Sequence, residues 1–167
     1  MNTLLRGAIA GVVATAVKAQ AEAWFQPAAE ALLPPSPEAL ERPGADPAGH
    51  RDEMPPSQVV DAASRAVTGS EPDEDTRSTA AESLHWAMGI GAGVAYALLR
   101  DRVPAVARGR GALWGLAVFG ATHATVLPAA GLQAPLTALP RAALVWEPGS
   151  HVAYGLAADL ALRGTRA

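Results

Sequence analysis

Apolar residues are concentrated in four stretches of the chain, residues 3–25, 83–99, 112–127 and 142–162. An α-helix rises about 1.5 Å per residue, so about 20 residues are needed to cross about 30 Å of membrane hydrocarbon. The first and last stretches are long enough for a membrane span. The two middle stretches are marginal, and they need flanking residues or local thinning of the bilayer.

The two middle stretches have no polar face. Almost every position in residues 86–99 and 112–126 is apolar or small, which suits a helix surrounded by lipid. The pattern predicts an all-α integral membrane protein, a four-helix bundle in which each apolar stretch is one span. The alternative is a soluble bundle of buried helices. Four tryptophans lie at stretch ends, where an interfacial aromatic belt places them: Trp24, Trp86, Trp114 and Trp146.

Charge predicts the orientation of the spans. Residues 26–82, called the outer loop below, hold 12 of the 16 acidic residues. Because short cytoplasmic loops are enriched in Lys and Arg, both termini and the loop between the second and third spans are predicted to face the cytoplasm. The outer loop is then extracytoplasmic. The arginines behind this prediction are Arg6, Arg100, Arg102, Arg108, Arg110, Arg163 and Arg166.

The first span has a competing interpretation as a cleaved signal peptide. Residues 1–23 contain an early Arg6, an apolar run and small residues before the end, which is the pattern of such a segment. Lys18 and Glu22 interrupt the region before the cleavage site. Whether the first span is retained or cleaved stays open at this point.

The outer loop is rich in Pro, Glu, Asp and Ala, a composition typical of partly irregular chain. One segment differs, because Val59, Val60, Ala63 and Val67 recur at helical spacing after Pro55-Pro56. A short amphipathic helix is therefore expected near residues 57–68. The chain as a whole is expected to form one membrane domain, residues 1–167, with this loop on its outer side.

Composition excludes several classes of protein. A net charge of -3 and a pI near 5.8 exclude a strongly basic nucleic-acid binder. The absence of Cys excludes a disulfide scaffold, a Cys zinc site and a thiol nucleophile. The expected partner is the lipid bilayer, with a homo-oligomer or a membrane complex as further candidates. Small residues dominate, with 39 Ala and 16 Gly, and close helix approach is expected at Gly7, Gly11, Gly89, Gly91, Gly93, Gly115 and Gly120.

Rare ionisable residues fall inside the apolar stretches. Lys18 is the only Lys, and Glu22 follows it at i+4 on the same helix face. Such residues are costly within a membrane and usually face a bundle interior or a cavity. In the predicted topology, residues of all four spans reach the outer third of the bundle. The sequence therefore predicts a shared polar cluster of Lys18, Glu22, His85, His123, Glu147 and His151.

Each residue of this cluster also has a simpler interpretation. Lys18 can extend its ammonium group to a membrane interface, with Glu22 at the helix end. A single His within a span commonly makes one interhelical hydrogen bond. Convergence of residues from four helices is harder to explain in this way, and it favours a common polar cavity.

Short motifs are spread over most of the chain outside the outer loop: Gly11-Val12-Val13, Val17-Lys18, Glu22, Pro34-Pro35, His85, Tyr96, His123, Leu127-Pro128, Gly131-Leu132, Glu147, His151 and Tyr154-Gly155. In these motifs the chain resembles the YagU-like family of bacterial inner-membrane proteins. The resemblance implies a four-span protein of the bacterial inner membrane with a role in acid stress, and it supplies no catalytic residues. The chain departs from the named member in its longer, more acidic outer loop.

Three functions are weighed for the predicted cluster. The favoured one is a non-enzymatic membrane protein that binds or relays protons, because His titrates near neutrality and carboxylates shift it. The second is a metal site of His85, His123, Glu147 and His151, or a b-type haem held by two His. A membrane enzyme with Glu147 and His151 as acid and base is less favoured, because no nucleophile or phosphate-binding motif is present. A structural subunit of a membrane assembly is the remaining alternative.

Overall fold

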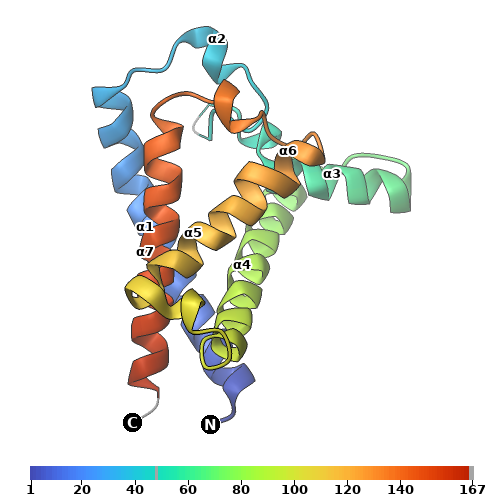
Figure 1. Cartoon of the computed structure of the whole chain (residues 1–167). Coiled ribbons are helices and arrows are strands. Elements are labelled where there is room, and N and C mark those ends of the chain that lie inside the picture. Colours follow the sequence, from blue (N-terminus) through green and yellow to red (C-terminus); the bar gives the residue numbers. More distant parts are fainter. Residues whose placement is uncertain (48, 166–167) are drawn as a thin grey trace.

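The computed structural model describes residues 1–47 and 49–165, and this part of the chain is helical with no strand. Helix α1 (Thr3–Leu32) packs along α7 (Ala143–Gly164) on one side and along α4 (Glu74–Leu99) on the other. Helix α5 (Ala112–Ala121) packs on α7. In the view of Figure 1, α5 runs obliquely from α7 toward the end of the molecule opposite the termini. Helix α1 is therefore the central element, because it packs against both α7 and α4.

Helix α1 is longer than the predicted span of residues 3–25. The side chain of Asn2 accepts a hydrogen bond from the backbone N–H of Leu5 at 2.8 Å and caps the helix. The helix continues through Pro27 and ends at Leu32, two residues before Pro34 of the Pro34-Pro35 pair. The extension is rich in Ala and Leu, which are strong helix formers, so the helix reaches into the region assigned to the outer loop.

Helix α4 begins at Glu74, nine residues before the predicted start at residue 83. Asp73 accepts hydrogen bonds from the backbone N–H and the hydroxyl of Thr76, both at 2.9 Å. These bonds lower the pKa of the Asp73 carboxyl below its ordinary value. The acidic residues Asp73, Glu74 and Asp75 therefore favour the start of the helix at this point, because negative side chains stabilise a helix N-terminus.

The third apolar stretch is not one regular helix. Helix α5 passes into a π-helical turn, η3 (Thr122–Val126), and then into the short α6 (Leu127–Ala129). The Thr125 hydroxyl donates to the carbonyl of Gly120, five residues earlier, at 2.8 Å. Turns of this type frequently lie at functional sites, and this one carries His123. The predicted span of residues 112–127 is thus helical at the expected place, but it changes from an α-helix to a π-helical turn at Thr122.

The outer loop contains more helix than its composition predicts. It holds α2 (Pro37–Leu40), the 3-10 turn η1 (Arg51–Glu53) and α3 (Pro55–Thr68). Helix α3 covers the segment expected to form a short amphipathic helix, and it lies across the outer end of α4 (Figure 1). Arg77 of α4 pairs with the buried Asp61 of α3 at 2.8 Å.

Glycines allow the helices to approach closely at five of the seven predicted positions: Gly7, Gly11, Gly89, Gly93 and Gly115. A Cβ added to Gly11 would lie 2.6 Å from the Cα of Ile90, so α1 and α4 pack backbone against backbone. At Gly115, an added Cβ would meet the backbone oxygen of His151 on α7. The prediction is wrong for Gly91 and Gly120, where an added Cβ would meet nothing within 4 Å.

Two helical stretches are long and apolar enough to cross a membrane, Thr3–Leu32 and Pro104–Ala129. The fourth predicted span, residues 142–162, corresponds to α7, and its Glu, His and Asp residues reduce its hydropathy. The second corresponds to α4, whose first turns are charged. Two of the four expected crossings are thus supported by length and composition, and the other two stay a prediction.

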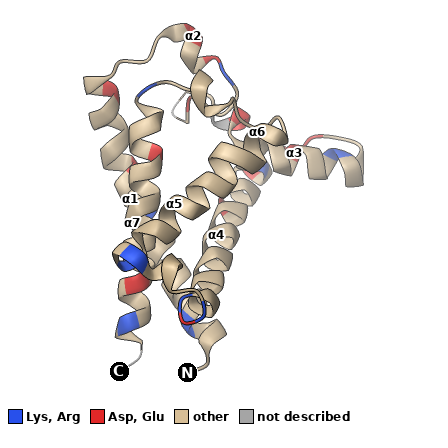
Figure 2. Ribbon diagram, in the orientation of Figure 1, with Lys and Arg blue, Asp and Glu red and all other residues tan. Residues whose placement is uncertain are grey.

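The two ends of the molecule differ in charge. The N- and C-termini lie at one end (Figure 1). Most acidic residues lie toward the opposite end, on the outer loop and on the first turns of α4 (Figure 2). The acidic side chains are therefore concentrated at the end away from the termini, and the orientation of the chain in a membrane stays a prediction.

Candidate functional site

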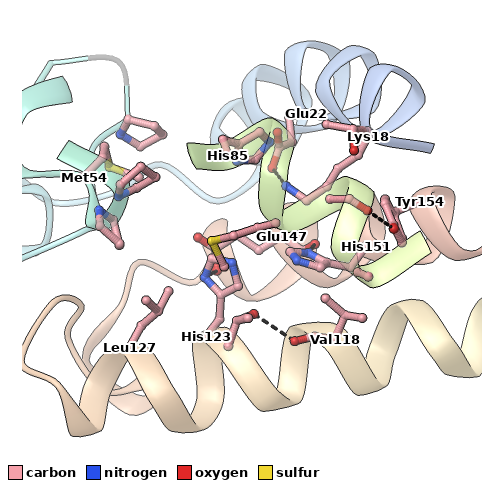
Figure 3. A pocket seen from close by; sticks show the side chains of 18 of the residues that line it. Lys18, Glu22, Met54, His85, Val118, His123, Leu127, Glu147, His151 and Tyr154 are labelled. Carbon is pink, nitrogen blue, oxygen red and sulfur yellow. Dashed lines mark hydrogen bonds and ion pairs between the residues drawn. The ribbon is translucent and has the colours of Figure 1, made fainter. Parts of the chain in front are cut away.

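A cavity of about 390 Å³ lies between α1, α4, η3 and α7 and is bordered by the start of α3. All six residues of the predicted polar cluster line it (Figure 3). Apolar side chains form most of the remaining wall, among them Met54, Val59, Leu84, Met88, Val118 and Leu127. The cavity therefore combines an ionisable floor with apolar walls.

Lys18 and Glu22 form an ion pair on α1, one turn apart. Lys18 is buried, and Glu22 is partly exposed. The hydroxyl of Ser150 on α7 lies 3.4 Å from the same carboxylate oxygen of Glu22. His85 of α4 lies on this side of the cavity (Figure 3). The positive charge of Lys18 is thus neutralised within its own helix.

His123 and His151 bring η3 and α7 together on the other side. Their rings meet edge to face, with centroids 5.0 Å apart, and Phe119 contacts both rings at 5.5 Å. The Nδ1 of His151 donates to the backbone oxygen of Glu147 at 2.8 Å. The Nδ1 of His123 donates to Oε1 of Gln133 at 2.9 Å. In both neutral rings Nε2 is therefore left as a hydrogen-bond acceptor.

Glu147 is a buried acidic residue of the cavity with an unsatisfied oxygen. It is only 3% exposed, and its Oε2 has no hydrogen-bond partner among the described residues. The nearest cationic candidate is Nδ1 of His123, 3.5 Å from that oxygen, and it is charged only when the imidazole is protonated. A buried carboxylate without a donor is costly. A proton on Glu147, or a hydrogen-bond donor on a bound molecule, would give this oxygen a partner.

Glu147 is the ionisable group of the cavity whose charge has no fixed counterion. Lys18 is paired with Glu22, and the imidazoles carry a charge only when they are protonated. Among the described residues, no three His, Cys, Asp or Glu side chains are grouped to hold a metal ion. His85, His123, Glu147 and His151 line one cavity without forming such a group, and a metal or haem at this place stays a prediction.

Sequence reasoning missed several residues of the site. Gln133 is buried and holds His123, but it lies in the connection after α6, and no spacing rule relates it to a span. Ser150 lies one turn after Glu147 and is fully buried. The Tyr154 hydroxyl donates to the backbone oxygen of Gly89 at 2.6 Å and joins α7 to α4 beside the cavity. Small polar residues in apolar helices were the signal available for Ser150.

A second polar group lies at the other end of α7. The carboxylate of Asp159 accepts from the Tyr96 hydroxyl at 2.9 Å. It pairs with Nη2 of Arg100 at 3.2 Å and with Nε of Arg163 at 2.7 Å. Asp159 lies on the same helical stripe as Glu147 and His151, yet it faces a separate network near the termini.

The chain belongs to a family of proteins of unknown function, DUF1440, whose model matches residues 12–160. This match covers all the residues that line the cavity. It agrees with membership of an uncharacterised family, while the particular likeness to the YagU-like proteins stays a prediction. Neither a curated protein nor a solved structure matches the chain significantly.

Proposed function

We propose that this chain is an inner-membrane protein that crosses the bilayer four times and binds protons in its outer-side cavity. The observation that carries the proposal is Glu147, a buried carboxylate whose Oε2 lacks a donor. Two titratable rings, His123 and His151, lie beside it. The role in acid stress that the family resemblance implies belongs to this proposal.

The surface of the helices supports a membrane setting. In the most apolar window of Pro104–Ala129 only 6% of the residues are buried inside the molecule. A core helix of a soluble protein is mostly buried, and large exposed apolar patches mark contact with a membrane or a partner. Exposed apolar side chains also cover the free face of α1 and the outer surface of α5 and α7, including Val12, Val13, Val17, Leu113, Leu116 and Leu160.

Proton binding follows from the groups that face Glu147. Helix α1 contributes the Lys18–Glu22 pair, α4 contributes His85, η3 contributes His123, and α7 contributes His151. When Glu147 is protonated, the floor of the cavity carries no net charge. When it is ionised, one imidazole can take up the proton and pair with it, as the 3.5 Å separation from His123 allows. The cavity therefore holds one exchangeable proton within this group.

Infrared difference spectroscopy of the full chain in lipid nanodiscs tests the proposal. A pH step is expected to produce a carboxylic acid band that shifts in heavy water and disappears in Glu147→Gln. The matched control is Glu82→Gln, because Glu82 is exposed on α4 and bonds to the Trp86 indole outside the cavity. This control is expected to keep the band. A band that survives Glu147→Gln, or no titrating band at all, would overturn the proposal.

Acid survival of cells that carry the protein gives a second readout. Substitution of His123, Glu147 or His151 is expected to reduce survival at unchanged protein level, because each removes a proton-binding group. Full survival of all three variants would contradict the link to acid stress.

A further inference from the structure

The cavity is much larger than proton binding requires. A proton needs one carboxylate and at most a few waters, and one water occupies about 30 Å³ of liquid volume. The observed volume of about 390 Å³ lies within the range of small-molecule sites, about 300–1,000 Å³. Such sites have apolar walls and a few converging polar groups, which is the arrangement seen here.

The cavity has an exposed edge where side chains of α4, α5 and α6 line it. Met88 lines it from α4 and is 50% exposed. Val118 and Leu127 line it from the facing side and are partly exposed. In the proposed membrane setting this side faces lipid, so a molecule with an apolar body can enter from the bilayer.

Three polar atoms of Glu147, His123 and His151 in the cavity are left as acceptors. Oε2 of Glu147 has no partner. The Nδ1 atoms of His123 and His151 are engaged, so their Nε2 atoms accept in the neutral rings. The one ammonium group, that of Lys18, is held by Glu22. A bound molecule with hydrogen-bond donors would satisfy these acceptors, and a positive charge matches the carboxylate.

We infer that the cavity binds an amphiphilic organic cation, an ammonium group on an apolar body, in exchange for the proton of Glu147. The inference rests on the proposed proton binding. In the exchange the carboxylic acid of Glu147 releases one proton to solution and becomes a carboxylate. The ammonium group donates to that carboxylate and keeps its own positive charge. Met54, Met88 and the neighbouring apolar side chains cover the apolar body.

Calorimetric titration of the full chain in nanodiscs with phenethylammonium tests this inference. Hydrocinnamate and phenethyl alcohol serve as the anionic and neutral probes of similar size, and empty nanodiscs correct for partition into lipid. Titration in buffers of different ionisation enthalpy counts the protons released. The expected result is preferential binding of the cation with release of about one proton. Glu147→Gln is expected to weaken binding about tenfold or more, because it removes one partner of a buried charge pair.

A second variant keeps the test independent of the folding of Glu147→Gln. Met88→Trp fills the cavity from its exposed edge without changing its charge, and is expected to abolish cation binding while the infrared band of Glu147 remains. Leu98→Trp is the matched control, because Leu98 is exposed on the same helix outside the cavity. This control is expected to bind the cation like the original chain.

The outcomes separate the inference from the proposed function. If Glu147 titrates in the infrared spectra but the cation does not bind, or hydrocinnamate binds as tightly, the inference is wrong and proton binding stands. Unchanged cation binding in Glu147→Gln or Met88→Trp also overturns the inference. If Glu147 does not titrate at all, the proposed function fails, and the exchange fails with it.

Discussion

Helix α7 carries two buried carboxylates, and they have opposite environments. Asp159, 1% exposed, faces the end near the termini and has one hydroxyl and two guanidinium partners. Glu147, 3% exposed, faces the cavity at the other end, and its Oε2 has no donor. The two residues are about 18 Å apart along the helix. Both carboxylates are almost fully buried, so the difference between them lies in their hydrogen-bond and ion-pair partners.

This difference separates a structural carboxylate from a candidate functional one. The partners of Asp159 join α7 to α4 through Tyr96 and Arg100. Glu147 has no fixed cation partner, so we expect its charge to change with its surroundings. Perturbed and incompletely paired groups in a cavity are candidates for function, whereas a fully paired buried group is costly to disrupt.

The largest expected effect is the loss of the Asp159 network. Asp159→Asn leaves Arg100, whose side chain is only 10% exposed, without its main counterion. Removing one partner of a buried ion pair costs about 3–5 kcal/mol. Asp101→Asn is the matched control, because Asp101 is an exposed partner of the same Arg100 at 3.7 Å. It is expected to cost less than about 1 kcal/mol. Unfolding of the purified protein in mixed micelles measures both, and equal losses would remove the contrast.

Packing along α7 is expected to show the same contrast with smaller effects. A Cβ at Gly155 would meet the backbone oxygen of Gly111, whereas a Cβ at Gly149 would lie 3.3 Å from the movable ring of Phe25. Gly155→Ala is therefore expected to cost about 1–3 kcal/mol through overpacking. Gly149→Ala is expected to change stability by less than about 1 kcal/mol, because Ala favours the helix by a similar amount. Equal changes in the free energy of unfolding for both substitutions would contradict tighter helix packing at Gly155 than at Gly149.

The smallest expected effect lies outside the cavity, at the start of α4. The hydrogen bonds from Thr76 lower the pKa of Asp73. The stability they contribute is therefore complete above the unfolded pKa of about 3.9 and is lost as pH falls through the lower folded pKa. Asp73→Ala is expected to speed amide hydrogen exchange in the first turn of α4 near neutral pH, while Asp73→Asn retains the cap. Exchange that Asp73→Ala leaves unchanged would contradict the role of this cap.

The sequence was sufficient to predict the helical class and the six ionisable residues that line one cavity. Apolar runs placed helices near their observed positions, and equal depth along them predicted that Lys18, His123 and His151 lie at one level. Depth follows directly from the helical rise. Helix ends were less predictable, because α1 and α4 extend into the outer loop through local capping and helix propensity.

The partners within the site could not be predicted in the same way. The bond between His123 and Gln133 depends on how the connection after α6 folds back. The engagement of Asp159, in contrast with the free oxygen of Glu147, depends on how far α7 is rotated against α4 and η3. Both are properties of tertiary packing and not of hydrophobic periodicity.

The most direct test of the free carboxylate on α7 is carboxyl-carbon NMR of the full chain in nanodiscs, with Glu labelled and the Glu147 signal assigned through Glu147→Gln. We predict that the Glu147 signal moves reversibly between its protonated and ionised positions as pH changes. A Glu147 signal that stays at its ionised position throughout would contradict proton binding at this carboxylate.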